Sequence, residues 1–289
     1  MTRLAVIGSG IMGNGIAQIG AFGGYATRLQ DISSEALAKA RKTIEANLRK
    51  GIERGKYEEA DMRRALGNLS YTTDLREAVG DADVVIEAVT ENLELKRALF
   101  ARLDELCPPR TLLATNTSAL SITAIAAATK RPAQVIGMHF FNPPHIMRLI
   151  EIVRGLETSD ESLRLAEEVS RRMGKETVAV NDKAGFITSR INAAIGNEAF
   201  RMLEEGVASA RDIDKAVRLG LNFPMGPFEL VDLVGLDTRL NALEFMHQHL
   251  GERYRPTPIH RTYVAAGRLG RKSGKGFFEY DANGNIIGE

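Results

Sequence analysis

Between residues 4 and 180, short apolar segments alternate with longer segments whose apolar residues recur at helical spacing. This alternation predicts strands followed by helices, and it favours a mostly parallel sheet with helices on both faces. The predicted strands cover residues 4–7, 26–30, 83–87, 111–115, 135–140, 147–153 and 176–180. The predicted helices of this part cover residues 11–22, 33–55, 58–66, 93–106, 121–128 and 159–173.

The strand predicted over residues 147–153 differs from the others in how the chain reaches it. Only a short turn with Pro143 and Pro144 separates it from the preceding strand. A parallel neighbour would need a crossover of about a dozen residues or more. The two strands are therefore predicted to be antiparallel, with His139 opposite or nearly opposite Glu151.

After residue 184 the pattern predicts helices and no strand before the C-terminal tail. These helices are expected over residues 184–205, 209–219, 227–250 and 258–266. With 289 residues in the chain and about 150 residues per domain, two domains are expected. The change of pattern places their boundary near Asn181 and Asp182, which gives domains of residues 1–181 and 182–289.

The composition is that of an ordinary globular protein, with 44% hydrophobic and 26% charged residues. The net charge of +1 argues against a protein that mainly coats nucleic acid or an anionic membrane. The single cysteine, Cys107, excludes a disulfide framework and a cysteine-based zinc cluster within the chain, and no metal site is predicted. It also fits the reducing cytoplasm, where we expect the protein to be located.

An uncharged stretch from Leu4 to Thr27 could be mistaken for a signal peptide or a membrane span. Its seven glycines and its polar residues interrupt any apolar segment of about 18 residues, the length that suggests a membrane span. We therefore predict that this stretch is folded structure, and we expect no association with a membrane.

A glycine motif in this stretch connects a predicted strand to a predicted helix and reads Gly8-Ser9-Gly10-Ile11-Met12-Gly13. In this position the first glycine permits a tight turn, the second lets the backbone approach a pyrophosphate, and the third lets the helix pack closely on the sheet. The N-terminus of the helix then offers N–H groups to the phosphates. We predict a Rossmann-type, doubly wound dinucleotide-binding domain, followed by an all-helical second domain.

Asp31 directly follows the second predicted strand, 23 residues after Gly8. This spacing is close to the roughly 20 residues expected before an acid that binds the ribose. Its carboxylate would accept hydrogen bonds from ribose hydroxyls and repel a 2′-phosphate, and the next residue is Ile32 rather than an arginine. The motif therefore predicts NAD in preference to NADP. The alternative is a glycine-rich turn followed by an ordinary surface aspartate.

His139 is the candidate catalytic base, because it ends a strand at the sheet edge where such folds bind ligands. A facing Glu151 would fix the imidazole tautomer and stabilise its charged form, which suits removal of a hydroxyl proton. The alternative is a structural histidine near a surface glutamate. Residues 116–120 follow another strand end and could hydrogen-bond a substrate oxygen, although spacing alone favours a loop and an N-cap.

Several motifs together resemble the short-chain L-3-hydroxyacyl-CoA dehydrogenase family, which includes bacterial 3-hydroxybutyryl-CoA dehydrogenases, over essentially the whole chain. Besides the glycine motif, they are Ile86-Glu-Ala-Val-Thr-Glu-Asn92, Thr115-Asn-Thr-Ser118, Gly137-Met-His-Phe-Phe-Asn-Pro143 with Glu151, Gly185-Phe-Ile187, Pro224-Met-Gly-Pro-Phe-Glu-Leu230 and Gly270-Arg-Lys-Ser-Gly-Lys-Gly-Phe277. The resemblance implies reversible, NAD-linked oxidation of an (S)-3-hydroxyacyl-CoA, such as 3-hydroxybutyryl-CoA, to the 3-oxoacyl-CoA. It also implies a homodimer formed through the C-terminal helical domain.

The resemblance gives expected roles to single residues. His139 matches the catalytic base, Glu151 its partner, and Ser118 a serine that contacts the substrate's 3-oxygen near the nicotinamide. Besides the glycine motif, Asp31 and Ser118, the residues that match the NAD site are Glu91, Lys96, Asn142 and Lys272. Two residues occupy places that touch coenzyme A in relatives, namely Asn47 and Arg54.

One position departs from the family's pattern. Relatives often have an active-site asparagine after the Gly-Phe-Ile segment, where this chain has Ser189. A hydroxyl can still form a hydrogen bond but is shorter than an amide, so Ser189 is retained as a candidate catalytic residue. Asn192 is an alternative, because it lies three residues further along nearly the same helix face.

A basic segment lies in and just after the helix predicted over residues 33–55. It contains two acidic residues and seven basic ones, Lys39, Arg41, Lys42, Arg49, Lys50, Arg54 and Lys56. Such a segment would attract the phosphates of coenzyme A. A solvated helical face is the alternative, and nucleic acid is disfavoured because no aromatic residues are interleaved.

Two other function classes are weighed against this interpretation. A free β-hydroxyacid dehydrogenase would share the glycine motif but would use a lysine on the helix between the domains, and residues 185–205 contain no lysine. A non-catalytic NAD-binding structural or sensor protein is disfavoured because His139, Glu151 and Ser118 are all present.

Overall fold

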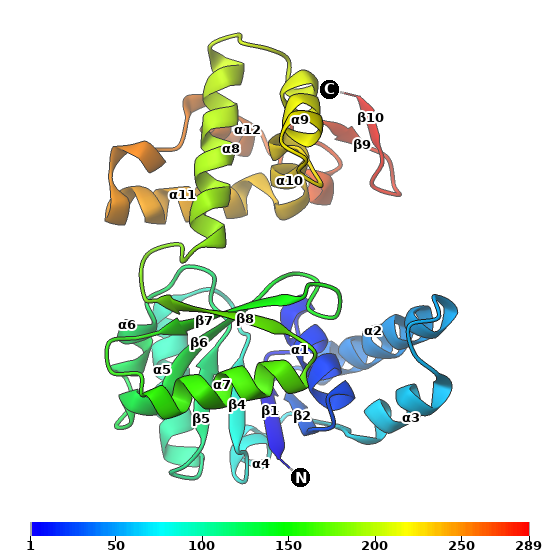
Figure 1. Cartoon of the computed structure of the whole chain (residues 1–289), viewed down its shortest axis with the longest axis vertical. Helices are drawn as coiled ribbons and strands as arrows, with labels where there is room; N and C mark the ends of the chain where they lie inside the picture. The colour runs from blue at the N-terminus through cyan, green and yellow to red at the C-terminus, as the bar shows by residue number, and fades with distance from the viewer. Residues whose placement is uncertain (1, 289) are drawn as a thin grey trace. The chain divides into compact units, whose positions relative to one another are not determined.

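The computed structural model describes residues 2–288, and its chain divides into two compact units between Phe186 and Ile187. The first unit contains an eight-stranded sheet with the strand order β3-β2-β1-β4-β5-β6-β7-β8 (Figure 1). The strands are β1 (Arg3–Ile7), β2 (Ala26–Gln30), β3 (Leu69–Thr72), β4 (Val84–Glu87), β5 (Leu112–Thr115), β6 (Val135–Phe140), β7 (Leu149–Arg154) and β8 (Glu176–Asn181). Only the pair of β6 and β7 is antiparallel, so the predicted, mostly parallel sheet is confirmed.

Successive strand residues alternate between two cores, one on each face of the sheet. Leu4 and Val6 of β1 belong to one core, whereas Ala5 and Ile7 belong to the other. The first core is covered by α1 (Ile11–Phe22), α2 (Ser34–Glu53), α3 (Glu59–Gly67) and α7 (Asp160–Arg172). The second core is covered by α4 (Leu75–Val79), α5 (Leu93–Leu106) and α6 (Ile122–Ala126). Both faces of the sheet are therefore buried, as the apolar strand segments predict.

The sequence pattern missed two short elements, β3 and α4. The edge strand β3 is four residues long and partly exposed, so it lacks the apolar run of a central strand. The five-residue helix α4 is too short to show helical periodicity, although Asp74 caps its N-terminus through two backbone N–H groups.

The second unit is mainly helical. Its elements are α8 (Thr188–Glu204), α9 (Ala210–Gly220), α10 (Pro227–Val234), α11 (Leu236–Leu250), α12 (Pro258–Ala265) and a small hairpin of β9 (Glu279–Tyr280) and β10 (Ile286–Gly288). The single helix predicted over 227–250 is wrong, because Gly235 has a φ of 103° and separates α10 from α11. Phe200, Phe228 and Phe277 pack together in the core of this unit.

The first unit extends beyond Asn181, where the sequence pattern placed the domain boundary. Asp182 accepts hydrogen bonds from the Ser121 hydroxyl and the Thr123 N–H group of this unit. Phe186 is buried in the unit's second core. The helix α8 begins later than predicted because Gly185 and Phe186 have φ angles of 74° and 48°, outside the helical region.

Within residues 2–288, none of the helices is both long enough and apolar enough to span a membrane. Nor do the described residues include a cluster of three histidine, cysteine or acidic side chains suited to a metal ion.

The order of the central strands determines where candidate chemistry can gather. The parallel strands β1, β4, β5 and β6 are neighbours in the sheet, so their carboxyl ends lie along one edge. The glycine motif, Glu87, Asn116 and His139 follow or end these four strands in turn. Ligands of doubly wound sheets bind at this edge, which makes it the candidate site of the first unit.

Candidate active site

The glycine motif forms a tight turn between β1 and α1. Gly8 has a φ of 95°, and a Cβ added there would lie 2.8 Å from the carbonyl oxygen of Ala88. A Cβ added to Gly13 would lie 1.7 Å from the carbonyl oxygen of Gly8, so only glycine fits. A Cβ added to Gly10 would meet nothing within 4 Å. The space beside Gly10 is thus open in the protein, as it must be where a backbone approaches a ligand.

Asp31 is tied directly to this turn. The backbone N–H and the hydroxyl of Ser9 both donate to Asp31 Oδ2 over 2.8 Å, and the Ser33 N–H donates to Oδ1 over 3.0 Å. Burial alone would raise the pKa of the Asp31 carboxyl, but these donors together lower its pKa below the ordinary value. Asp31 is therefore ionised at neutral pH beside the glycine motif.

A cavity of about 480 Å³ lies against the motif and Asp31. Its lining includes Ser9, Gly10, Ile11 and Asn14 from the turn and α1, together with Asp31. The size falls within the roughly 300–1,000 Å³ of small-molecule sites. The open space at Gly10, the N-terminus of α1 and the carboxylate at the rim fit the pyrophosphate and ribose of a dinucleotide.

Glu91, Lys96 and Ser118 lie together at the ends of β4 and β5. The Ser118 N–H donates to Glu91 Oε1 over 2.9 Å, and the Thr117 hydroxyl donates to the same oxygen over 2.5 Å. Lys96 is fully buried, and its Nζ lies 3.4 Å from Glu91 Oε2. The Glu91 side chain remains 43% exposed, so of the two predicted cofactor residues it is the accessible one.

Glu87 was missed as a site residue by sequence reasoning, whereas Asn116 belongs to the segment 116–120 already considered there. Glu87 ends β4 as a fully buried carboxylate and bonds Lys96 Nζ over 2.6 Å. Asn116 follows β5, and its side-chain oxygen accepts the N–H of Phe140 over 2.9 Å, which joins the ends of β5 and β6. The signal for Glu87 was present in the sequence, since a charged residue that ends an apolar strand needs a partner when buried.

His139 and Glu151 are brought together as predicted, since the two residues are direct partners in the antiparallel ladder of β6 and β7. Nδ1 of His139 lies 2.7 Å from Glu151 Oε2. The histidine is 5% exposed and Glu151 is fully buried. The imidazole also packs against the rings of Phe141 and Phe186, with centroid distances of 4.6 and 5.8 Å. The bond at Nδ1 leaves Nε2 as the ring nitrogen for a ligand.

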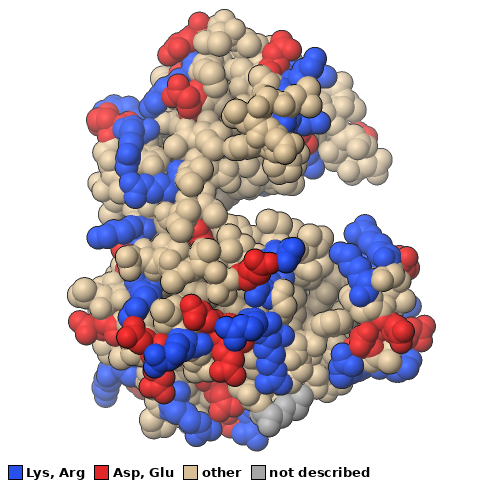
Figure 2. All heavy atoms as spheres, in the orientation of Figure 1, with Lys and Arg blue, Asp and Glu red and all other residues tan. Residues whose placement is uncertain are grey.

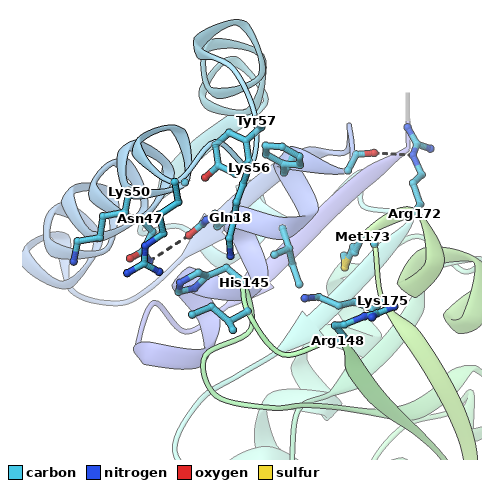
Figure 3. Close-up of a pocket in the computed structure, with 17 residues that line it drawn as sticks. Gln18, Asn47, Lys50, Lys56, Tyr57, His145, Arg148, Arg172, Met173 and Lys175 are labelled. Carbon is cyan, nitrogen blue, oxygen red and sulfur yellow. Dashed lines mark hydrogen bonds between the residues drawn. The ribbon is translucent and has the colours of Figure 1, made fainter.

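The predicted coenzyme A residues Asn47 and Arg54 line a second cavity of about 710 Å³ (Figure 3). Basic side chains enter it from α2 and from the opposite wall, and its charged lining residues are Lys50, Arg54, Lys56, Arg148, Arg172 and Lys175. Among the described residues that line it, none is acidic. Figure 2 shows Lys and Arg side chains gathered over the end of α2.

The basic residues of this cavity differ in their hydrogen-bond and ion-pair partners. Lys175 donates to the carbonyl oxygens of Pro144 and Met147, which fixes the turn after β6. For Lys50, Arg54 and Lys56, by contrast, no carboxylate partner occurs within residues 2–288. The cavity thus presents unneutralised positive charge.

His145 lies between the two cavities and lines both of them, as does Asn47. Burial, together with the charges of Lys175 and Lys56, lowers the pKa of the His145 imidazole. Asn142, another predicted cofactor residue, is exposed in the same turn and precedes a cis peptide bond to Pro143.

Ser189 and Lys272 belong to the second unit. Ser189 lies half-buried in the first turn of α8, three residues before the alternative Asn192. Lys272 Nζ lies 2.6 and 2.7 Å from the two carboxylate oxygens of Asp237, beside the φ-positive Gly235. The Asp237 carboxylate thus neutralises the Lys272 ammonium group within this unit.

Comparison with known proteins defines the class to which these two units belong. Residues 3–183 match the NAD-binding domain of 3-hydroxyacyl-CoA dehydrogenase, and residues 185–280 match the C-terminal domain of the same enzyme. The chain therefore belongs to the 3-hydroxyacyl-CoA dehydrogenase family. It is an NAD-dependent oxidoreductase of this family, with a β-oxidation-type role.

Individual relatives agree over the full length of the chain. A probable 3-hydroxybutyryl-CoA dehydrogenase of Bacillus subtilis is 45% identical over 280 residues, which cover 96% of this chain and 97% of that protein. A 3-hydroxyadipyl-CoA dehydrogenase of Escherichia coli is 46% identical over 98% of this chain and 60% of its own length. The crystal structure of (S)-3-hydroxybutyryl-CoA dehydrogenase from Ralstonia eutropha is similar with a TM-score of 0.93 and 40% identity, and covers 97% of this chain and 99% of that one.

These matches decide between the function classes weighed from the sequence. Both domains match the 3-hydroxyacyl-CoA dehydrogenase family, so a free β-hydroxyacid dehydrogenase and a non-catalytic NAD-binding protein are no longer favoured. The family implies NAD and an acyl-CoA as ligands.

Proposed function

We propose that the chain oxidises a short (S)-3-hydroxyacyl-CoA, with 3-hydroxybutyryl-CoA as the preferred substrate, and that His139 and Glu151 are its general-base dyad. The observation that carries this proposal is the 2.7 Å contact between the two side chains, both buried at the carboxyl edge of the sheet. The names of the relatives in Bacillus subtilis and Ralstonia eutropha support the substrate.

In the oxidative direction, His139 Nε2 takes the proton of the 3-hydroxyl group while the C3–H bond breaks and the C3–O double bond forms. Bound NAD⁺ supplies the acceptor for the hydride that leaves C3. Glu151 holds Nδ1, which keeps Nε2 free to accept the proton, and its negative charge stabilises the imidazolium that results. In the reverse direction the imidazolium returns its proton to the oxygen at C3.

Ser118 is proposed to donate a hydrogen bond to the oxygen at C3. Its backbone is held by Glu91, so the hydroxyl is presented from a fixed position at the end of β5. Glu91 and the exposed Asn142 are proposed to face the cofactor, whereas the fully buried Lys96 would act on it through Glu91. Lys272 of the second unit stays a predicted cofactor residue. The Asp31 carboxylate would bind the adenosine ribose and repel a 2′-phosphate, which favours NAD over NADP.

Asn47 and Arg54 are proposed to bind the phosphates of coenzyme A. The support is the basic cavity that they line, because its free positive charges and lack of described acidic side chains suit a ligand with several phosphates. His145 and Asn47 line this cavity and the one beside the glycine motif, so the two nucleotide ligands would bind next to each other.

A charge substitution tests this assignment. Arg54→Met is expected to raise the KM for acetoacetyl-CoA at least about tenfold, because a hydrogen bond to a charged group contributes roughly 1.5–3 kcal/mol. The matched control is Arg49→Met, which removes the same charge from an exposed residue of α2 that does not line the cavity. Initial rates at low and high salt measure both, and equal KM values for the two variants would contradict the assignment.

We further propose a homodimer formed through the second unit. Several large apolar side chains there are 40–73% exposed, namely Ile187, Ile191, Leu219, Leu221, Phe223, Leu233 and Val234. Phe223 and the α8 residue Ile195 line one small pocket, so the loop before α10 neighbours α8. Sedimentation at micromolar concentration is expected to show a dimer, and Ile191→Glu is expected to produce monomers. A monomeric wild-type protein would reject this proposal.

The substrate is tested by a chain-length series of 3-oxoacyl-CoA compounds, with NADH and NADPH compared side by side. The expected result is the highest kcat/KM with acetoacetyl-CoA and NADH. A higher kcat/KM with a longer acyl chain, or with the carboxylated 3-oxoadipyl-CoA suggested by the Escherichia coli relative, would refute the proposed substrate.

A further inference from the structure

A buried network of charged groups connects the interior of the sheet to the candidate site. It begins at Glu87, which is fully buried at the end of β4. Glu87 Oε1 accepts hydrogen bonds from the Val89 N–H over 2.7 Å and from Lys96 Nζ over 2.6 Å. Glu87 Oε2 accepts the hydroxyl of Thr115 over 2.6 Å. Three donors therefore hold the carboxylate in one position.

Lys96 is the second member of the network. Its ammonium group is also fully buried, and it lies between two carboxylates, at 2.6 Å from Glu87 Oε1 and 3.4 Å from Glu91 Oε2. Lys96 Nζ also donates a long hydrogen bond to the carbonyl oxygen of Val89, over 3.5 Å. Since Glu87 is much closer than Glu91, most of the neutralisation of the ammonium comes from Glu87.

Glu91 is the outer member. Lys96 attracts Glu91 only weakly, through Oε2. The other oxygen of Glu91, Oε1, therefore accepts hydrogen bonds from the Thr117 hydroxyl and the Ser118 N–H and holds the loop after β5. Thr117 in turn accepts the N–H of Leu120, which fixes the rest of that loop. The position of Ser118 thus depends on Glu91, and that of Glu91 depends on how Lys96 is neutralised.

We infer that Glu87 is a positioning residue for the reaction: by neutralising Lys96 inside the protein, it keeps Glu91 on the loop of Ser118 and available to the cofactor. Glu87 touches neither ligand and acts through Lys96. This inference rests on the proposed roles of Glu91 and Ser118. It adds to them a buried residue that the sequence did not identify as part of the site.

The charge of Glu87, rather than its shape, carries this role. Glu87→Gln keeps the size of the side chain and an oxygen that can accept from Lys96 and Val89. It leaves a buried ammonium whose only remaining carboxylate is Glu91, and a buried charge without a partner is strongly unfavourable. Glu91 is then expected to move towards Lys96 and away from Thr117 and Ser118.

The experiment compares two substitutions at the same buried contact, each measured well below its melting temperature. Glu87→Gln removes the charge, whereas the control Thr115→Val removes only a hydrogen bond to the same carboxylate. The dissociation constant of NADH is measured by fluorescence titration, the folded state by circular dichroism, and the KM of NADH by initial rates. We expect both variants to lose thermal stability, but only Glu87→Gln to raise the Kd and KM of NADH, by about tenfold or more.

Unchanged NADH affinity in Glu87→Gln, or an equal loss in Thr115→Val, would overturn the inference, because Glu87 would then have a structural role only. If Glu87→Gln does not fold, the double variant Glu87→Gln/Lys96→Met removes both charges together and is expected to fold, because no buried ammonium is left without a carboxylate. With no ammonium to draw Glu91 away from Ser118, its NADH affinity is expected to match that of the wild type. A loss of affinity of about tenfold in the double variant would overturn the inference.

A third variant separates this inference from the function on which it rests. Glu91→Gln tests whether Glu91 faces the cofactor. If Glu91→Gln leaves the Kd of NADH unchanged, the proposed role of Glu91 fails. If Glu91→Gln weakens NADH binding while Glu87→Gln does not, only the role of Glu87 fails.

Discussion

Replacing His139 with glutamine is expected to lower turnover with 3-hydroxybutyryl-CoA by about 10²–10⁴-fold, the usual contribution of a general base. Glutamine retains a polar group near Glu151 but cannot accept and hold a proton at neutral pH. The cavity beside the glycine motif is not lined by His139, so the affinity for NADH should be retained. The expected result is therefore a loss in kcat without a loss of cofactor binding.

Stopped-flow measurement of NADH formation gives the turnover number, and fluorescence titration gives the Kd of NADH. The matched control is His249→Gln, which changes an exposed histidine of α11. Full activity in His139→Gln, with its folded state verified by circular dichroism, would refute the assignment of the base.

Substitutions in the glycine motif give the second large expected effect. Replacing the second glycine, Gly10, or the third, Gly13, with alanine should have different consequences. In Gly13→Ala the new Cβ would meet the Gly8 carbonyl oxygen at 1.7 Å, so the turn must open even without a ligand. Overpacking of this kind typically costs about 1–3 kcal/mol, occasionally more, and a distorted turn would weaken NADH binding by about 10- to 100-fold. In Gly10→Ala nothing lies within 4 Å of the new Cβ, so the free protein should be unaffected.

Differential scanning calorimetry without and with NADH separates the two cases. Gly13→Ala should melt several degrees lower than the wild type in the absence of cofactor. Gly10→Ala should melt with the wild type when free, but should gain less stability from NADH because its methyl group occupies the space needed by the pyrophosphate. Wild-type behaviour of Gly10→Ala with NADH would mean that the cofactor does not approach the backbone there.

Much of the fold could be predicted from the sequence because its strands are continuous apolar segments. Leu4 to Ile7 and Val84 to Ile86 are buried on both faces, and such segments are readily identified. The helix predicted over residues 11–22 has the bounds that the structure gives to α1. The break between α10 and α11 was not predicted, since helical periodicity continues across Gly235 and only its φ of 103° shows the interruption.

The candidate site was predictable where two residues are connected by strand geometry. The short turn at Pro143 and Pro144 fixed the direction of β7, and counting along the strands then placed Glu151 opposite His139. The network of Glu87, Lys96 and Glu91 could not be derived in this way. The network depends on how the Lys96 side chain of α5 turns back towards Glu87 at the end of β4. Spacing along the chain does not determine this direction.

The basic segment shows both outcomes within one helix. Lys50 and Arg54 line the large cavity as an attraction for phosphates would require. Arg41 instead pairs with Glu45 on the helix surface, as expected for a solvated helical face. Charge counted along a sequence cannot separate these two groups. The opposite wall of the cavity, built from the turn before β7 and from residues 172–175 at the end of α7, decides which side chains face it.

In the proposed reaction, the dyad of His139 and Glu151 acts directly on the oxygen at C3 of the substrate. A crystal structure of the wild-type protein with NAD⁺ and acetoacetyl-CoA tests it, because two oxidised ligands cannot react with each other. His139 Nε2 is expected to lie within about 2.6–3.2 Å of the 3-oxygen, with Glu151 still bonded to Nδ1. A 3-oxygen bound out of reach of His139, both directly and through one water molecule, would contradict it.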